Sequence, residues 1–312
     1  MSNVLSAYSK QQQIEEIAKY IPHERILRNE PMAAHTTFRV GGCADVFVEI
    51  DAIAELEKLC LVLGDNFYLI GNGSNVLVSD SGIRGIVLHL SKAFSAISAE
   101  GECLVCEAGA SLAAVAKAAY ENGLSGFEFA SGIPGSLGGA VVMNAGAYDG
   151  EIRQVIEWVK LMTPDGKIVQ KSNEEMHFSY RHSILKEERL IVLAAAIRLK
   201  SSDPAQIKVK MEDLAQRRRE KQPLEYPSAG STFKRPEGYF AAKLIQDAGL
   251  SGFSIGGACV SSKHCGFVIN TGNATANDIY LLIKEVQKRV MEYAGVRLEP
   301  EVLFLGDFGS ER

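Results

Sequence analysis

The most unusual stretch of the chain is ASGIPGSLGGAVVMNAGAYDGE, at residues 130–151. Gly, Ala and Ser dominate it, so we expect too few large side chains for a core, and it is too short to link independent domains. Residues without a Cβ lose much conformational entropy on folding, which makes sense where the backbone must approach a ligand closely. A small-residue helix face that packs against a neighbour is the alternative. The residues in question are Gly132, Pro134, Gly135, Gly138 and Gly139.

A second glycine cluster, Gly71-Asn72-Gly73-Ser74-Asn75, follows the apolar run FYLI. It does not match a dinucleotide-binding fingerprint, because Val76 stands where the third glycine belongs and the following VLVSD is typical of a strand rather than a helix. Successive N–H groups in a tight loop between strands form a concave anion site that fits a pyrophosphate, and a plain hairpin turn is the alternative. Two separate phosphate-friendly loops suggest a dinucleotide.

The patterns around these loops predict an α+β protein. Helices are expected over residues 12–27, 51–63 with Asp51 as N-cap, 110–123 with Ser111 as N-cap, 204–223, 239–250 and 275–293. Strands are expected in TTFRVGGCADVFVEI, FYLIG, NVLVSD, GIVLHL, CLVCEAG, LIVLAAAIRLK and VRLEPEVLFLG, and in a hairpin that turns at Pro164-Asp165-Gly166.

Composition limits the possible functions. The 312 residues are 46% hydrophobic and 23% charged, as in ordinary globular proteins, with a formal net charge of -5. No block of like charges exceeds Arg217–Arg219, which argues against a nucleic-acid surface. The N-terminal residues lack the basic start and apolar run of an export signal, and no stretch has the length of a membrane span. We therefore predict a cytoplasmic protein with a small-molecule partner.

The cysteines are scattered through apolar segments, as expected of thiols that a reducing compartment keeps free. Cys103 and Cys106 have the C-x-x-C spacing of a metal or redox pair, but no second pair follows and the segment reads as a strand. We interpret both as buried thiols. The histidines show no helical ligand spacing, so we predict no metal site.

Five motifs together carry a family resemblance. In order they are GNGSNVLVSD, ASGIPGSLGGAVVMNAGAYDGE, SYRHS, SAGSTFKRP and LEPEV. This combination resembles the UDP-N-acetylenolpyruvoylglucosamine reductase (MurB) family, in its shorter subtype, from about Thr36 to Phe304. The resemblance implies an FAD-binding half of the PCMH or vanillyl-alcohol-oxidase type and a smaller α/β substrate-binding domain. We predict that the FAD-binding half covers residues 1–205, with its PCMH-type part at about 35–200. The substrate-binding domain is expected at residues 206–297, and residues 298–312 are expected to pack against the FAD-binding half.

The resemblance also implies non-covalent FAD, NADPH as reductant and UDP-N-acetylglucosamine enolpyruvate as substrate, in peptidoglycan precursor synthesis. Residues 71–75 and 132–139 would then hold the flavin pyrophosphate and ring system, with Arg39 and Asn144 nearby. Substrate contacts are expected from Tyr180 and, on charge alone, from Arg218, Lys221 and Lys234.

Three residues match the family's catalytic positions. Arg181 would bind the substrate carboxylate through planar donors that suit it better than lysine would. Glu301 would face the same group, and we expect it to be protonated in the working complex, because a second carboxylate would repel the developing charge. Ser231 would donate a proton to the carbon next to the carboxylate.

Other interpretations stay open. Taken singly, Arg181 is typical of a surface ion pair, Ser231 of a turn and Glu301 of a solvated strand edge. An FAD oxidase or dehydrogenase of the same fold is one alternative function, and a non-catalytic flavin-binding module is another. The sequence does not indicate an oligomeric state.

Overall fold

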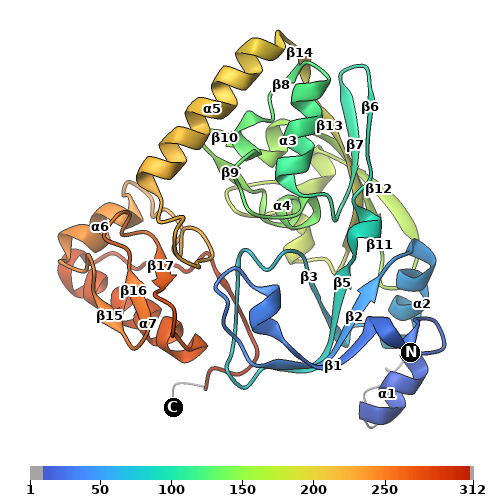
Figure 1. Ribbon diagram of the computed structural model, residues 1–312, viewed down its shortest axis with the longest axis horizontal. Coiled ribbons are helices and arrows are strands. Elements are labelled where there is room, and N and C mark those ends of the chain that lie inside the picture. Colours follow the sequence, from blue (N-terminus) through green and yellow to red (C-terminus); the bar gives the residue numbers. More distant parts are fainter. Residues whose placement is uncertain (1–9, 310–312) are drawn as a thin grey trace. The chain divides into compact units, whose positions relative to one another are not determined.

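The computed structural model describes residues 10–309, and its contacts divide the chain into two units that interleave along the sequence (Figure 1). Unit 1 contains the described residues up to Arg28, Val46–Gly71 and Gly85–Arg217. Unit 2 contains Asn29–Asp45, Asn72–Arg84 and the described residues from Arg218 onward. Helices and sheets occur in both, so the predicted α+β class is confirmed. The functional domain limits predicted from the sequence stay a prediction.

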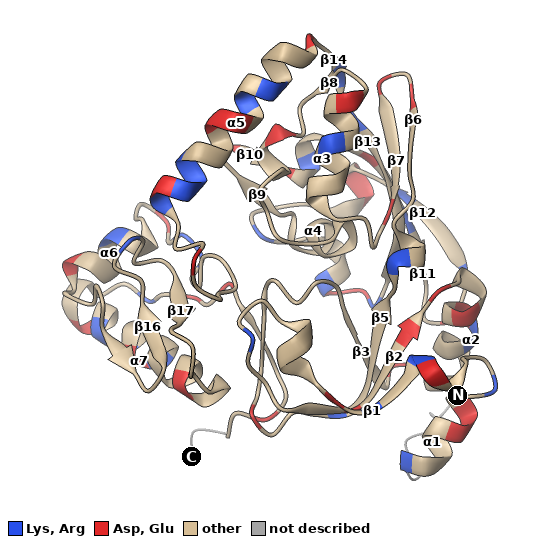
Figure 2. Ribbon diagram, in the orientation of Figure 1, with Lys and Arg blue, Asp and Glu red and all other residues tan. Residues whose placement is uncertain are grey.

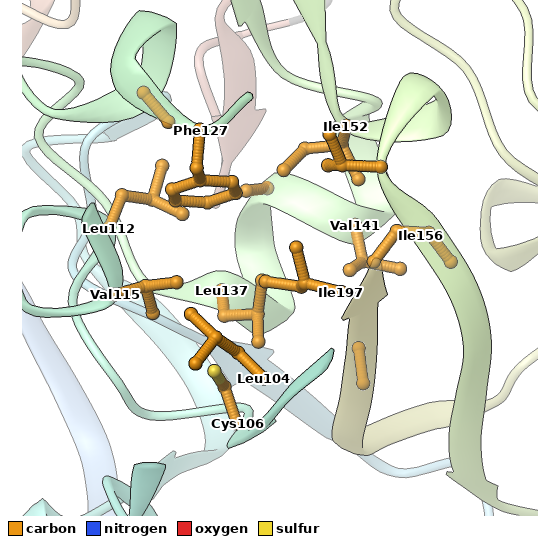
Figure 3. Close-up of a cluster of buried hydrophobic side chains, with 14 of the residues drawn as sticks. Leu104, Cys106, Leu112, Val115, Phe127, Leu137, Val141, Ile152, Ile156 and Ile197 are labelled. Atoms are coloured by element: carbon orange, nitrogen blue, oxygen red, sulfur yellow. The ribbon is translucent and has the colours of Figure 1, made fainter. Parts of the chain in front are cut away.

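A five-stranded antiparallel sheet forms the centre of unit 1. Its strand order is β12-β11-β13-β7-β6, from β12 (Ile168–Ser172), β11 (Ile156–Met162), β13 (Ile191–Arg198), β7 (Cys103–Glu107) and β6 (Ile97–Glu100). Helices α3 (Leu112–Glu121) and α4 (Leu137–Met143) pack their apolar faces against it, and Figure 3 shows the side chains that meet between them. β13 is buried along nearly its whole length, which explains its unbroken apolar sequence.

A second sheet has the order β1-β2-β5-β3, from β1 (Ile26–Pro31), β2 (Cys43–Ile50), β5 (Ile83–Leu90) and β3 (Phe67–Ile70). Its residues in unit 1 pack with α1 (Lys10–Ile17) and α2 (Ile53–Leu63) in a separate apolar cluster. Short paired strands complete the unit, namely β8 (Leu124–Ser125) with β14 (Lys200–Ser201), and β9 (Gly146–Ala147) with β10 (Gly150–Glu151). The long helix α5 (Pro204–Lys221) carries acidic and basic side chains along its length (Figure 2).

Unit 2 is built on the C-terminal third of the chain together with two earlier segments. Helices α6 (Ala241–Asp247) and α7 (Ala276–Ala294) pack with a sheet of order β15-β16-β17, from β15 (Ser254–Ile255), β16 (Ala258–Val260) and β17 (Val268–Asn270). The strand β4 (Val76–Val78) pairs in parallel with β18 (Leu303–Leu305). Phe38, Val40 and Leu77 enter the same core, so residues near the start of the chain complete a unit that consists mostly of its end.

Most predicted elements are confirmed, including α3 with its Ser111 cap, the hairpin at Gly166 and helix α7. The N-terminal region was predicted wrongly. Helix α1 ends at Ile17 rather than near residue 27, because Pro22 lacks an N–H and its ring disfavours helical backbone before it. Residues 26–31 form a strand instead.

Two further expectations were wrong. Residues 36–42 form no strand, because Arg39 and Gly41 have φ angles of 57° and 120° that bend the chain. Asp51 is not the cap of α2: the helix begins after Ala52, and the Glu55 carboxylate accepts the N–H groups of Asp51 and Ala52 instead.

The glycine-rich stretch also contributes to a core, contrary to the expectation from its composition. Within it, helix α4 buries Leu137, Ala140 and Val141 against the central sheet of unit 1. Small residues permit this because the helix lies close to β7 and β13, as its contacts with both strands show. Among residues 10–309, no helix combines the length and apolar character that crossing a membrane requires.

A carboxylate from a distant segment accepts the first backbone N–H groups of helix α7. Asp80 accepts the N–H groups of Ala276 and Asn277 at 2.9 and 2.8 Å, through one oxygen each. We predict that Asp80→Ala lowers the free energy of unfolding by about 1–2 kcal/mol, because two N-terminal helix donors lose their acceptor. Urea unfolding would measure the change, and Asp80→Asn, which keeps one acceptor oxygen, should lose less. Equal stability of Asp80→Ala and the unmodified protein would contradict the assignment.

Candidate active site

The loop at residues 71–75 connects β3 to β4 and has the form expected of an anion site. Gly73 has a φ of +60°, and a Cβ there would lie 1.9 Å from the carbonyl oxygen of His35, so no other residue fits without a shift. The N–H of Thr37 donates to the Gly73 carbonyl at 3.1 Å. Within residues 10–309, the successive N–H groups of residues 72–75 donate to no protein acceptor. Four such groups in one tight loop are available to an anion.

The glycine cluster at residues 132–139 divides into packing and open positions. The N–H groups of Leu137, Gly138 and Gly139 already donate to Ala110, Ala108 and the Ser136 hydroxyl, so this helix end is satisfied within the protein. A Cβ on Gly138 would lie 3.1 Å from the Cβ of Ala108, which gives this glycine a packing role. Packing of a small-residue helix face, one of the two interpretations of this cluster, therefore applies to Gly138, while close approach to a ligand stays a prediction for the exposed glycines.

Gly139 differs from Gly138 because it faces open space. A Cβ there would have a single neighbour within 4 Å, the Ser136 hydroxyl at 3.6 Å. Gly132 and Pro134 are also exposed, and Gly135 is partly exposed. A Cβ on Gly71 would lie 2.6 Å from the same Ser136 hydroxyl, so the end of the first loop meets the second cluster. Exposed residues without a Cβ are thus available for close approach of a ligand to the backbone.

Three of the predicted site residues have backbone that L-amino acids rarely adopt. Arg39, Asn144 and Arg181 have φ angles of 57°, 42° and 54°. Asn tolerates this left-handed region, but each arginine stores strain that its surroundings must offset. Four described residues outside the predicted site share this backbone region, so it does not by itself select Arg39 and Arg181; they are Asn29, Tyr148, Asp149 and His177.

Asn144 is fully buried and organises the loop that carries Arg181. Its amide nitrogen donates to Glu151 at 2.8 Å and to the Ser179 carbonyl at 2.9 Å, and its oxygen accepts the N–H of Arg153 at 2.9 Å. Both amide hydrogens are therefore engaged within the protein. Asn144 closes helix α4 in the left-handed conformation and ties the helix end to residue 179.

Arg181 lies in a short loop fastened to the end of helix α4. Its guanidinium donates to the Gly146 carbonyl at 3.1 Å and lies 5.0 Å from the ring centroid of Tyr180, which is half exposed. The buried Ser183 hydroxyl donates to the carbonyl of Val142 at 2.7 Å. Arg181 is partly exposed, so a planar donor group is held at the surface of unit 1 on a fixed loop.

Ser231 and Glu301 lie on two antiparallel segments of unit 2. The N–H of Glu301 donates to the Thr232 carbonyl at 2.8 Å, and Phe233 and Pro300 form the next pair. Thr232 is fully buried, and its hydroxyl accepts the N–H of Val268 at 2.9 Å. Ser231 is exposed beside this anchored residue and Glu301 is half-buried. Ser231 thus directly precedes the residue that bonds the backbone of Glu301.

The predicted diphosphate contacts differ in their surroundings. Lys234 forms an ion pair with Glu299, so a diphosphate would have to displace this carboxylate. Arg218 and Lys221 lie in the last turn of helix α5, where Lys221 is exposed. Thr232 and Asp80 are structural residues that the sequence reasoning missed. Only the position of Thr232 between Ser231 and Phe233 could have indicated that it is buried.

The predicted site residues therefore form one group in each unit. The unit 1 group contains Gly71, Gly132, Pro134, Gly135, Gly138, Gly139, Asn144, Tyr180 and Arg181. The unit 2 group contains Arg39, Asn72, Gly73, Ser74, Asn75, Arg218, Lys221, Ser231, Lys234 and Glu301.

Two family models match different parts of the chain. Residues 44–172 match the family model described as FAD binding domain, and residues 222–305 match UDP-N-acetylenolpyruvoylglucosamine reductase, C-terminal domain. The chain is 52% identical over 297 residues to the UDP-N-acetylenolpyruvoylglucosamine reductase of Caldanaerobacter subterraneus, covering 94% of this chain and 98% of that protein. It is 51% identical over 309 residues to that of Agathobacter rectalis, covering 95% and 98%.

A solved structure gives the same result. The crystal structure of UDP-N-acetylenolpyruvylglucosamine reductase (MurB) from Thermus caldophilus matches with a TM-score of 0.81 and 33% identity. The match covers 90% of this chain and 99% of that one.

The open position at Gly139 provides a test of cofactor binding. We predict that Gly139→Ala leaves the protein folded, with a thermal midpoint unchanged or higher, because alanine favours helix and its methyl group meets no clash. The affinity for FAD should fall, since the methyl group occupies space that the ligand needs. Fluorescence titration of the apoprotein would measure this. A variant that binds FAD as tightly as the unmodified protein would remove Gly139 from the site.

Proposed function

Because the chain belongs to the UDP-N-acetylenolpyruvoylglucosamine reductase family, we propose that it reduces UDP-N-acetylglucosamine enolpyruvate to UDP-N-acetylmuramate with NADPH and FAD. This reaction is a step of peptidoglycan precursor synthesis. The observation that carries the proposal is the pairing in unit 2 of the segment of Ser231 with the segment of Glu301, in a chain that matches its relatives over almost their whole length. A flavin-binding module without catalysis needs no such pair.

The residues of both glycine loops fit FAD. The free N–H groups of residues 72–75 suit the pyrophosphate. Gly132 and Gly139 are exposed, Gly135 is partly exposed, and none of the three presents a Cβ to the larger ring system. Bound there, FAD would supply the hydride-transfer chemistry between NADPH and the terminal vinyl carbon of the substrate.

Arg181 binds the substrate carboxylate in this proposal. Addition of hydride to the vinyl carbon places negative charge on that carboxylate, so a fixed cationic donor stabilises the transition state more than the ground state. The tether to Gly146 and the anchored loop hold the guanidinium in place before the substrate arrives. Less reorganisation is then needed during the reaction.

Ser231 and Glu301 complete the reaction. Ser231 donates its hydroxyl proton to the carbon next to the carboxylate, which is basic enough at this stage to accept it from a weak acid. Glu301, in its protonated form, donates a hydrogen bond to the charged carboxylate rather than repelling it. Tyr180, Arg218, Lys221 and Lys234 contact the substrate elsewhere.

The cytoplasm is the proposed location, because the six cysteines are all free thiols, as a reducing compartment keeps them. Burial raises the pKa of Cys106 to about 12, and Cys60 also lies in an apolar core, so these two thiols are inert packing groups.

The catalytic roles predict a separation of binding from turnover. Ser231→Ala should keep its FAD and still oxidise NADPH in a single turnover, because the hydroxyl is exposed and outside both glycine loops. Its kcat with the enolpyruvyl substrate should fall by about 100-fold or more, the usual contribution of a positioned proton donor. Stopped-flow absorbance and product analysis would measure both. Activity within the range of the unmodified protein would contradict the assignment, and Ser228→Ala serves as a control on a nearby serine of the same unit.

A further inference from the structure

We propose that the side chain of Asn75 is a positioning residue for Glu301 rather than a ligand of the cofactor. The inference rests on the function proposed above and adds a residue to its machinery. The Asn75 amide nitrogen donates to the backbone carbonyl of Glu301 at 3.0 Å, across 226 residues of sequence. This bond fixes the orientation of the Asn75 side chain toward the Glu301 backbone.

The backbone of Asn75 belongs to the same connection. The N–H of Leu303 donates to the Asn75 carbonyl at 3.0 Å, and the parallel pairing of β4 with β18 continues from Val76 and Leu303 onward. Asn75 therefore contacts the segment of Glu301 twice, once through its side chain and once through its backbone. Its own N–H remains available to the anion loop.

Glu301 is consequently fixed from two sides. Its N–H donates to the carbonyl of Thr232, which belongs to the segment of Ser231, and its carbonyl accepts the Asn75 amide. Removing either bond frees one end of the peptide that carries the carboxyl group. Because displacement of a reacting group by about 1 Å costs roughly 100-fold in rate, this frame matters for proton transfer.

The geometry also connects cofactor binding with proton donation. The loop at residues 72–75, whose N–H groups suit the flavin pyrophosphate, ends at the residue that aligns Glu301. An anion that orders this loop also orders Asn75. The Glu301 carboxyl group is thus aligned when the protein has its cofactor bound.

The test compares Asn75→Asp with Asn122→Asp. Asp has nearly the same size as Asn but replaces the donor with an acceptor, which repels the Glu301 carbonyl. Asn122 is the matched control, since its amide also donates to a backbone carbonyl, that of Ala118 at 2.8 Å, at an exposed helix end in unit 1. Each protein is assayed for FAD affinity, for flavin reduction by NADPH and for reoxidation by the enolpyruvyl sugar.

The new carboxylate lies in the anion loop, so Asn75→Asp is assayed at saturating FAD, and the neutral Asn75→Ser is the variant expected to retain its FAD affinity. At saturating FAD we expect the rate of reduction by NADPH to change little in both variants, while reoxidation by the sugar slows by about 10- to 100-fold. In a Glu301→Gln background the same substitution should add little further loss, because the two residues act through one group. Hydrogen exchange of the peptide 299–305 should be faster in Asn75→Asp without cofactor. Asn122→Asp should match the unmodified protein throughout.

Several results would overturn the proposal: unchanged reoxidation, loss of FAD affinity in the neutral Asn75→Ser, equal slowing of both half-reactions at saturating FAD, or full additivity with Glu301→Gln. If circular dichroism shows that Asn75→Asp does not fold, Asn75→Ser is judged by the same criteria. Its side chain is too short to donate to the Glu301 carbonyl. If the unmodified protein itself is not reoxidised by the sugar, the proposed function fails, independently of Asn75.

Discussion

The parallel pairing of β4 with β18 is the constraint on which unit 2 depends. It joins residues 76–78 to residues 303–305, so the segment after the first glycine loop becomes the strand beside the last strand of the chain. Once this pair forms, Leu77 enters the core of the C-terminal unit and Asp80 meets the first N–H groups of α7. The loop at residues 72–75, Glu301 and Thr232 are then held in one hydrogen-bonded frame.

This arrangement explains why one short motif serves several purposes. GNGSNVLVSD begins with free backbone N–H groups, continues with an asparagine that reaches Glu301, and ends with the carboxylate that caps a helix. A substitution in this motif can therefore affect cofactor binding, catalysis or stability, according to its position. Measurements that separate these three properties are needed to interpret any variant of it.

Much of the fold could be predicted from the sequence where local signals decide. Ser111 marks the start of α3, the Pro164-Asp165-Gly166 turn marks a hairpin, and the apolar run at 191–198 marks a buried strand. The long-range contacts could not be predicted from the sequence. The residues around Asn75 and Asp80 do not indicate that each has a hydrogen-bond partner more than 190 residues away. The bend at Arg39 was also hidden, since arginine gives no indication of left-handed backbone.

The residues of the candidate site could be predicted from the sequence, but the hydrogen bonds that hold them in place could not. Motif resemblance selected Arg181, Ser231, Glu301 and Asn144. That Asn144 holds the loop of Arg181, and that the buried Thr232 bonds Glu301, became visible only through the hydrogen bonds. The composition of residues 137–141 also gave no sign of their burial, because a helix of small residues can pack closely enough to join a core.

The central claim is that this chain passes electrons from NADPH through a flavin to an enolpyruvyl sugar. The most direct measurement is the visible spectrum of the purified, FAD-loaded protein without oxygen, first with NADPH and then with UDP-N-acetylglucosamine enolpyruvate. The account predicts a yellow protein that bleaches with NADPH and regains its colour when the sugar is added. A protein that stays colourless after incubation with FAD, or a bleached flavin that only oxygen reoxidises, would contradict it.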